Sequence, residues 1–290
     1  MPLSLDHIVI RVQDLEATIA HFSSLGFTVQ RGGTHADGAT HNALIGFADG
    51  SYFELIAFLR DAPEHRWWDA GNRVGDGFVD FALLPPSVAA TIDAAHGRGL
   101  IYDGPIAGGR VRPDGERLEW QIGKPRSADL PFLCGDLTPR HLRVAEGDVR
   151  RHANGADGVA NITLAVHDLD ASLARYRALL GEFNAQRAPL PGYGVRLAIL
   201  ALGPTTLTLV NPSSASGPAN QPGAAEGPAE GLASDIRKHL AARGEGVFAV
   251  ALGTQTGGSP RAFPRELTHG AILELVAAPR SLTVAGPVVN

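Results

Sequence analysis

The chain of 290 residues carries a formal net charge of −5 at pH 7, with 44% hydrophobic and 19% charged residues. This length suits two domains of ordinary size, and the charge favours neither nucleic acid nor an anionic membrane as a partner. Because the sequence lacks an apolar run of ~20 residues and MPLSLDHIVI does not resemble a signal peptide, we expect a cytoplasmic protein.

Residues 4–60 predict a β-α-β-β-β module. LDHIVIRV is rich in β-branched residues and predicts a strand, after which Asp14 suits a helix N-cap and Gly26 the helix end. FTVQRGG, HNALIGFADG and SYFELIAF follow as three strands separated by glycine-containing turns.

The same unit returns later in the chain. In ANITLAVHDLDASLARYRALLG, Asn161 takes the place of His7 and Asp168 that of Asp14, both at an offset of 154 (161 − 7 and 168 − 14). Residues 77–136 are a weaker copy, and the region after 244 holds a shortened one. We therefore expect an α+β fold with an N-terminal domain over 1–144 (modules about 4–60 and 77–136), a linker over 145–157 and a C-terminal domain over 158–290.

These modules resemble the vicinal oxygen chelate superfamily, and in particular its glyoxalase-like domain family. The similarity rests on GGTHADGATHNALI, with His35, Thr40 and Asn42, and on LDHIVIRVQDL and GSYFELIAF. It implies that paired modules form cupped mixed sheets, giving two glyoxalase-like domains, with a divalent metal in the cup. Carried over to this sequence, the ligands from the first and last strands are His7 and Glu54.

The residues themselves leave two interpretations of this pair open. Strand alternation places His7 on one face with Leu5 and Val9, and Glu54 on one face with Tyr52. A carboxylate in an apolar strand is costly unless it is paired, so a shared cation or a buried hydrogen bond without metal would satisfy both groups. The single cysteine, Cys134, excludes a disulfide and a thiolate-rich zinc site.

The second module departs from the family pattern. Val79, beside Asp80, stands at the place of His7, and a residue of PFLCG, such as Cys134, at that of Glu54. His35, or less readily His41, would complete a site for Fe, Mn, Ni, Co or Zn, since imidazole and carboxylate suit these ions. We expect His35 and Glu54 to act in proton transfer.

The C-terminal modules do not predict a metal site. Their equivalent positions hold Asn161, Thr208, Phe248 and Glu274, and one carboxylate cannot hold a divalent ion. His239 and His269 fall on a polar helix face and in a loop, where histidines are usually structural.

Two adjacent tryptophans, Trp67 and Trp68, fall in a loop after the Glu54 strand, where they would cover a pocket or seal a module junction. The full set of candidate pocket residues is Asn42, Tyr52, Trp67, Trp68, Asp80 and Cys134.

The function expected from the resemblance is a metal-dependent lyase or isomerase acting on a small oxygen-bearing metabolite. A dioxygenase is less favoured because the usual His-His-Glu iron set is not evident in the sequence. The alternatives are a metal-free protein that sequesters a small molecule or antibiotic, and a structural protein. The sequence does not decide between a monomer and a homodimer.

Overall fold

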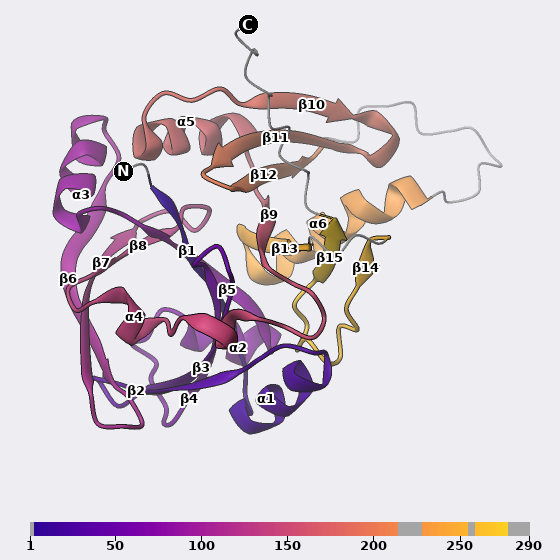
Figure 1. The fold of residues 1–290 in the computed structure, drawn as a ribbon. Helices are drawn as coiled ribbons and strands as arrows, with labels where there is room; N and C mark the ends of the chain where they lie inside the picture. The colour runs from indigo at the N-terminus through magenta and orange to yellow at the C-terminus, as the bar shows by residue number, and fades with distance from the viewer. Residues whose placement is uncertain (1–2, 214–227, 255–258, 278–290) are drawn as a thin grey trace, which may run out of the picture.

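The computed structural model describes residues 3–213, 228–254 and 259–277, and these form two β-sheets with helices packed on them (Figure 1). The first sheet is a closed barrel in the order β1-β4-β3-β2-β6-β7-β8-β5. Its strands are β1 (Ser4–Arg11), β2 (Gln30–His35), β3 (Thr40–Gly46), β4 (Tyr52–Phe58), β5 (Gly77–Leu84), β6 (Tyr102–Val111), β7 (Arg117–Pro125) and β8 (Phe132–Asp136). Its helices are α1 (Leu15–Ser24), α2 (Trp68–Val74), α3 (Val88–Gly97) and α4 (Arg140–Arg143), followed by the 3₁₀ turn η1 (Gly147–Arg150).

The second sheet has the order β10-β11-β12-β9-β13-β15-β14. Its strands are β9 (Gly158–Ala165), β10 (Gln186–Leu190), β11 (Val195–Leu202), β12 (Thr205–Pro212), β13 (Gly246–Thr254), β14 (Arg261–Ala262) and β15 (Leu273–Ala277). Helices α5 (Leu169–Leu180) and α6 (Pro228–Arg243) and the 3₁₀ turn η2 (Pro191–Tyr193) complete it. The expected α+β fold and its repeated modules are therefore confirmed, although the end of the last module, 278–290, lies outside the described residues.

The expected cup of the first two modules is closed into a ring. β1 and β5 pair antiparallel on one side, and β2 and β6 pair on the other through Thr34 with Val111 and His35 with Arg110. Each module also contains one parallel pair, β1 with β4 in the first and β5 with β8 in the second. Closure gives the barrel an interior separated from the outer helices.

Predicted helix caps are present in the repeated modules. The Asp14 carboxylate accepts a hydrogen bond of 3.0 Å from the amide of Ala17, and Asp168 accepts one of 3.0 Å from the amide of Ala171. Ser87 caps α3 in the same way. Each side chain satisfies an amide that the first helical turn leaves unpaired, which fixes where each helix leaves its strand.

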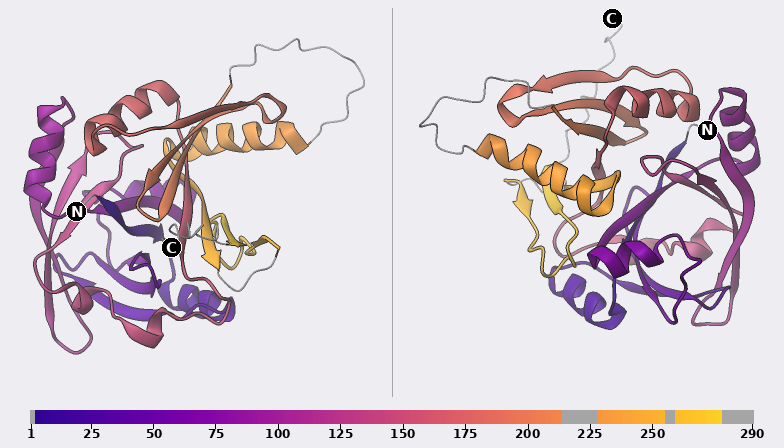
Figure 2. Two further views of the ribbon diagram at one scale, coloured as in Figure 1. Left: turned by 45° about the horizontal axis from the view of Figure 1, so that its top comes forward. Right: turned by 180° about the vertical axis from the view of Figure 1, so that it is seen from behind.

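Helix α6 occupies the face of the second sheet that corresponds to the barrel interior (Figure 2). Ala233, Ile236 and Leu240 of α6 pack with Ala165 of β9 and Val210 of β12. Ala165 lies on the same side of β9 as Asn161, because side chains alternate along a strand. The cup that the C-terminal modules would form is thus filled by a helix.

The two sheets share one hydrophobic core. Buried residues of both halves, including Ile8, Leu83, Leu164 and Leu252, belong to a single cluster, and α3 contacts α5. The segment 145–157 between the sheets is packed as well, since the buried His152 bonds the carbonyl of Gly46 at 3.0 Å. The division into domains over 1–144 and 158–290 with a linker over 145–157 stays a prediction.

Helix α6 should make the protein sensitive to acid through His239. Burial, together with nearby Arg243, lowers the pKa of His239 from 6.5 to about 4. As the pH drops, His239 is protonated in the unfolded chain before it is protonated in the folded protein. The free energy of unfolding should therefore fall between pH 6.5 and about 4, by at most about 1.4 kcal/mol per pH unit.

Urea denaturation across this pH range tests the expectation. His239→Gln should flatten the decline relative to wild type, whereas His167→Gln, at an exposed position, should not. Identical slopes for wild type and His239→Gln would contradict it.

Candidate functional site

The barrel encloses a cavity of about 420 Å³, within the range of small-molecule sites. Residues of β1 to β4, β6 to β8 and the loop before α2 line it. Of the residues singled out in the sequence, His7, His35, Asn42, Tyr52, Glu54, Trp67 and Cys134 all contribute to this lining.

Glu54 lies at the centre of the polar part of the cavity. The Nε2 atom of His7 is 3.5 Å from its Oε2, and the Nε2 atom of His35 is 3.4 Å from its Oε1. The amide nitrogen of Asn42 donates a hydrogen bond of 2.6 Å to Oε1. Two imidazoles and an amide thus meet at one buried carboxylate.

Both imidazoles are held through their other ring nitrogen. Nδ1 of His7 lies 2.6 Å from the Asp6 carboxylate, and Nδ1 of His35 lies 2.8 Å from the Thr40 hydroxyl. Such partners fix the ring orientation and direct each Nε2 at one oxygen of Glu54, and metal-binding histidines are commonly held through the other ring nitrogen in this way.

A β-bulge produces the side-by-side placement of Asp6 and His7. The pairing of β1 with β5 skips Asp6, so Asp6 has no partner residue across the strands. The bulge also corrects the predicted alternation, because Leu5 packs with Ile8 in the main core rather than sharing the face of His7.

Asp6 is completely buried and is paired with two arginines. Arg143 donates to both of its oxygens, at 2.8 and 3.1 Å, and Arg140 donates to Oδ1 at 2.5 Å. Burial alone would raise the pKa of Asp6, but Arg143, His7 and Arg140 hold it well below the usual value. Arg143 also donates to the hydroxyl of Tyr52 at 2.6 Å, and the Tyr52 ring stacks on His7 at 4.6 Å.

These contacts favour the charged form of both partners at the centre, and His7 would have to release its proton to become a metal ligand. Burial would lower the pKa of His7, yet its hydrogen bonds to Asp6 and Glu54 raise it. Burial would raise the pKa of Glu54, yet His35 and His7 hold it well below the usual value. A carboxylate stable in its charged form is what a cation at this point would require.

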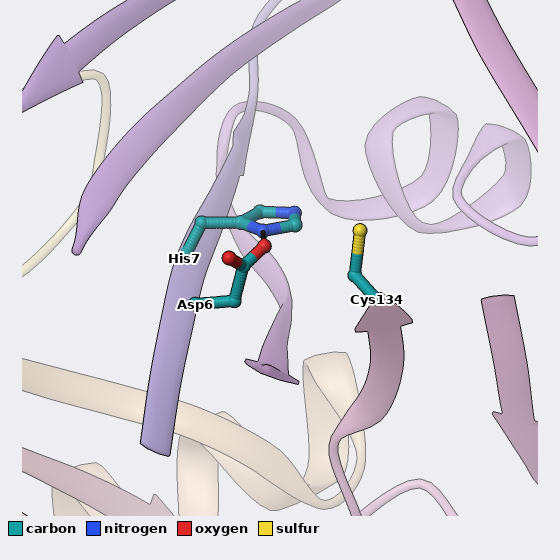
Figure 3. A group of neighbouring side chains, drawn as sticks. All are labelled: Asp6, His7 and Cys134. Carbon is teal, nitrogen blue, oxygen red and sulfur yellow. Dashed lines mark hydrogen bonds and ion pairs between the residues drawn. The ribbon is translucent and has the colours of Figure 1, made fainter. Parts of the chain in front are cut away.

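Asp6, His7 and Cys134 are the one group in the described part of the chain whose three ligand-type atoms all lie within 4.8 Å of one another (Figure 3). Its chemistry fits a metal poorly. Both oxygens of Asp6 already accept from arginines, and burial raises the pKa of the Cys134 thiol, which disfavours the thiolate. The opposite side of His7, towards Glu54, has the better ligand set.

The donors around Glu54 are of the types that a divalent cation takes. Separations of 3.4 and 3.5 Å are long for charge-assisted hydrogen bonds, which are typically about 2.8 Å. Each is close to the spacing of about 3.4 Å between ligands held about 2.1 Å from a tetrahedral ion. The three groups together are more widely spaced, since no choice of one ligand atom from each puts all three within 4.8 Å of one another. His7, His35 and Glu54 would hold an ion after a movement of one of these side chains.

The strand pairing corrects the expected positions of the second module. Val9 pairs with Glu54, and Ala82, its counterpart in β5, pairs with Phe132. Phe132 rather than Cys134 therefore stands at the place of Glu54. A bulge at Val79 likewise puts Asp80, not Val79, at the place of His7.

Two predicted pocket residues lie away from the cavity surface. Asp80 is covered by Arg66, which forms an ion pair with it, and by Trp67, whose Nε1 donates to it at 3.0 Å. Trp68 begins helix α2 instead of lying in a loop, and its ring packs edge-on against Phe58. Trp67 therefore lines the cavity, and Trp68 packs on the end of β4 outside it.

At the C-terminal positions, hydrogen bonds within the protein satisfy the polar groups. The amide nitrogen of Asn161 donates to the hydroxyl of Thr208 at 2.7 Å, and these residues take the places of His7 and Glu54. In β13 a bulge at Phe248 removes this residue from the pairing with β9. Ala249 therefore takes the place that Asp80 has in β5, which corrects the expectation of Phe248 there. His269 bonds Asp76 and His21 between the two halves, and His239 lies in α6.

Sequence reasoning missed three cavity residues, His65, Arg110 and Trp120. Arg110 lies in GPIAGGR, whose glycines and proline do not suggest a strand, although β6 passes through it. His41, in contrast, follows the alternation of β3 and lies opposite to Asn42, outside the cavity lining.

With this geometry in view, comparison with known proteins gives a consistent assignment. The profile of the glyoxalase-like domain family matches residues 5–180, so the chain belongs to this family of the vicinal oxygen chelate superfamily. No curated protein sequence matches it. No helix in the described ranges is long and apolar enough to cross a membrane.

Solved structures support the fold. A hypothetical protein from Staphylococcus aureus aligns with a TM-score of 0.67 and 14% identity, over 95% of this chain and 99% of that one. A mutant of 4-hydroxymandelate synthase from Streptomyces coelicolor aligns with a TM-score of 0.57 and 16% identity, over 88% and 72%. At these identities the similarity establishes the architecture.

The ion-pair cluster beneath His7 generates a prediction. Arg143→Met should destabilise the protein by about 3–5 kcal/mol, because Asp6 would stay buried with fewer charged partners. Urea denaturation at pH 7 measures this cost. Arg151→Met, at an exposed pair with Asp148, should leave the midpoint unchanged, and equal midpoints for both variants would refute the role given to Arg143.

Proposed function

We propose that the protein is a metal-dependent enzyme of the vicinal oxygen chelate type, acting on a small oxygen-bearing substrate in the barrel cavity. The observation that carries this proposal is the meeting of two anchored imidazoles, His7 and His35, at the Glu54 carboxylate. We assign the three side chains as ligands of a divalent ion, one of Fe, Mn, Ni, Co or Zn.

When bound, the ion would act as a Lewis acid that stabilises negative charge developing on substrate oxygens. The chain's own residues prepare the site. Asp6 and Thr40 orient the imidazoles, and Asn42 orients Glu54 through its hydrogen bond of 2.6 Å.

Proton transfer beside a substrate carbonyl is the favoured reaction class, as in an isomerase or lyase. His65 lines the cavity, and burial lowers its pKa, so its imidazole is uncharged near neutral pH and available to accept a proton. Trp67 and Phe132 provide apolar walls that limit the access of water.

A dioxygenase is the second candidate, favoured by one observation. Two histidines and one carboxylate are the set typical of non-haem Fe(II) oxygenases, and the structure places His7, His35 and Glu54 together. The argument against iron drawn from the sequence therefore no longer applies. Oxygen consumption by Fe(II)-loaded protein, against deuterium exchange into substrate, separates the two reactions.

Elemental analysis of protein purified without chelator or immobilised nickel tests the metal. Wild type should contain near-stoichiometric metal, and His7→Ala/Glu54→Ala should lose it. His41→Ala, which removes an imidazole outside the cavity lining, should retain it. Wild-type protein that neither contains nor takes up any of the five metals would refute the proposal and favour the metal-free sequestering protein.

His35→Ala separates ligation from the acid–base role expected from the sequence. As a ligand, His35 should contribute at least about 10-fold to metal affinity. Unchanged metal content with loss of turnover would instead assign it to proton transfer.

A further inference from the structure

Arg110 is a buried cation in the cavity wall that forms no ion pair with a carboxylate of the described residues. Its side chain is 4% exposed and lines the cavity. Nη1 donates to the carbonyl of Gly32 and Nη2 donates to that of Arg143 at 2.9 Å, and no acidic side chain of the described residues forms an ion pair with it. A guanidinium has five donors, so two carbonyls leave most of its hydrogen-bonding capacity unused. Glu54 attracts the charge, but burial outweighs this attraction and lowers the pKa of Arg110.

The other guanidinium groups at this cavity are neutralised. Arg143 is paired with Asp6 and Asp136, and Arg66 is paired with Asp80. Burying a charge without a counter-ion costs several kcal/mol, and an anion entering the cavity would recover part of this cost. Arg110 therefore differs from its neighbours in lacking its anion within the protein.

The position of Arg110 places it beside the proposed metal ligands. Arg110 pairs with His35 across β6 and β2, and directly opposed residues of neighbouring strands point to the same face. The side chain of His35 reaches Glu54 from there, so the guanidinium and the carboxylate centre share one wall of the cavity.

A second unmatched group lies next to it. The Oδ1 atom of Asn42 is buried and has no hydrogen-bond partner, while its amide nitrogen is committed to Glu54. Gly32, whose carbonyl accepts from Arg110, packs so closely that a Cβ there would lie 1.9 Å from Oδ1. Gly32 therefore covers this oxygen and holds Asn42 in the orientation in which its amide nitrogen serves Glu54, beside the guanidinium of Arg110.

We propose that the site takes a small 2-hydroxy acid, with Arg110 binding the carboxylate and the hydroxyl turned towards Glu54. This rests on the proposed function, because the same hydroxyl would lie next to the His7–His35–Glu54 centre. One guanidinium matches a monoanion, which favours a carboxylate over a phosphate. Trp67, Trp120 and Phe132 line the rest of the cavity and suit an apolar substituent.

Calorimetric titration with 3-phenyllactate, its amide and 3-phenylpropanoate tests the inference. Wild-type protein should bind the acid about 10- to 100-fold more tightly than the amide, as expected for a hydrogen bond to a charged group. It should also bind 3-phenylpropanoate, which lacks the hydroxyl, more weakly than 3-phenyllactate. Arg110→Gln should abolish the preference for the acid over the amide, Arg110→Lys should retain part of it, and Arg117→Gln, an exposed control on β7, should leave it intact.

Equal affinity of wild type for acid and amide, or binding of neither, would overturn the inference. That comparison needs no variant, so it holds even if Arg110→Gln fails to fold. A preference for the acid that persists in folded Arg110→Gln would also overturn it.

Metal content measured on the same samples keeps the two proposals apart. A preference for the acid in protein that takes up no metal would support the role of Arg110 and refute the metal-dependent enzyme. Bound metal without any preference for the acid would support the metal-dependent enzyme and refute the role of Arg110.

Discussion

The buried pairing of Asp6 with Arg143 and Arg140 is the constraint on which the site depends. A fully buried carboxylate persists only if cations and hydrogen bonds neutralise it, and both arginines come from α4, directly after the last strand of the barrel. The pair therefore ties the end of the second module to the first strand. It also orients His7, because the remaining interaction of Asp6 is with Nδ1 of that ring.

Around this pair, the barrel separates its polar groups into two functions. His7, His35 and Asn42 converge on Glu54, where charge is balanced within the protein. Arg110 lies on the same wall without a carboxylate partner. A cavity that is neutral at its centre and cationic at one side is suited to hold an anionic substrate by one end while its neighbouring oxygen reaches the reactive groups.

The second sheet shows how the same module loses such a site. Asn161 and Thr208 take the places of His7 and Glu54, and they satisfy one another by a hydrogen bond of 2.7 Å. Ile236 and Leu240 of α6 fill the space where the barrel keeps its cavity. The C-terminal half shares a single apolar core with the barrel, so it contributes packing where the N-terminal half contributes chemistry.

The sequence by itself determined the modules, their helix caps and two central residues. Local signals carry this information, because Asp14 and Asp168 cap helices through contacts three residues away and because a repeat is visible without knowing how its copies pair. His7 and Glu54 stood out as polar residues in apolar strands, and the resemblance to the glyoxalase-like family suggested a role for them.

Only the tertiary structure decided which residues meet. The bulge at Val79 shifts the alternation of β5 by one residue, so that Asp80 replaces Val79 at the place of His7. The register of β5 with β8 puts Phe132, two residues before Cys134, at the place of Glu54. Arg110 reaches the cavity because β6 closes the barrel against β2, a pairing between distant segments that no local pattern encodes. Strand register and ring closure depend on the packing of the whole barrel. For that reason the sequence could point to His7 and Glu54 but not to Arg110 in the cavity wall.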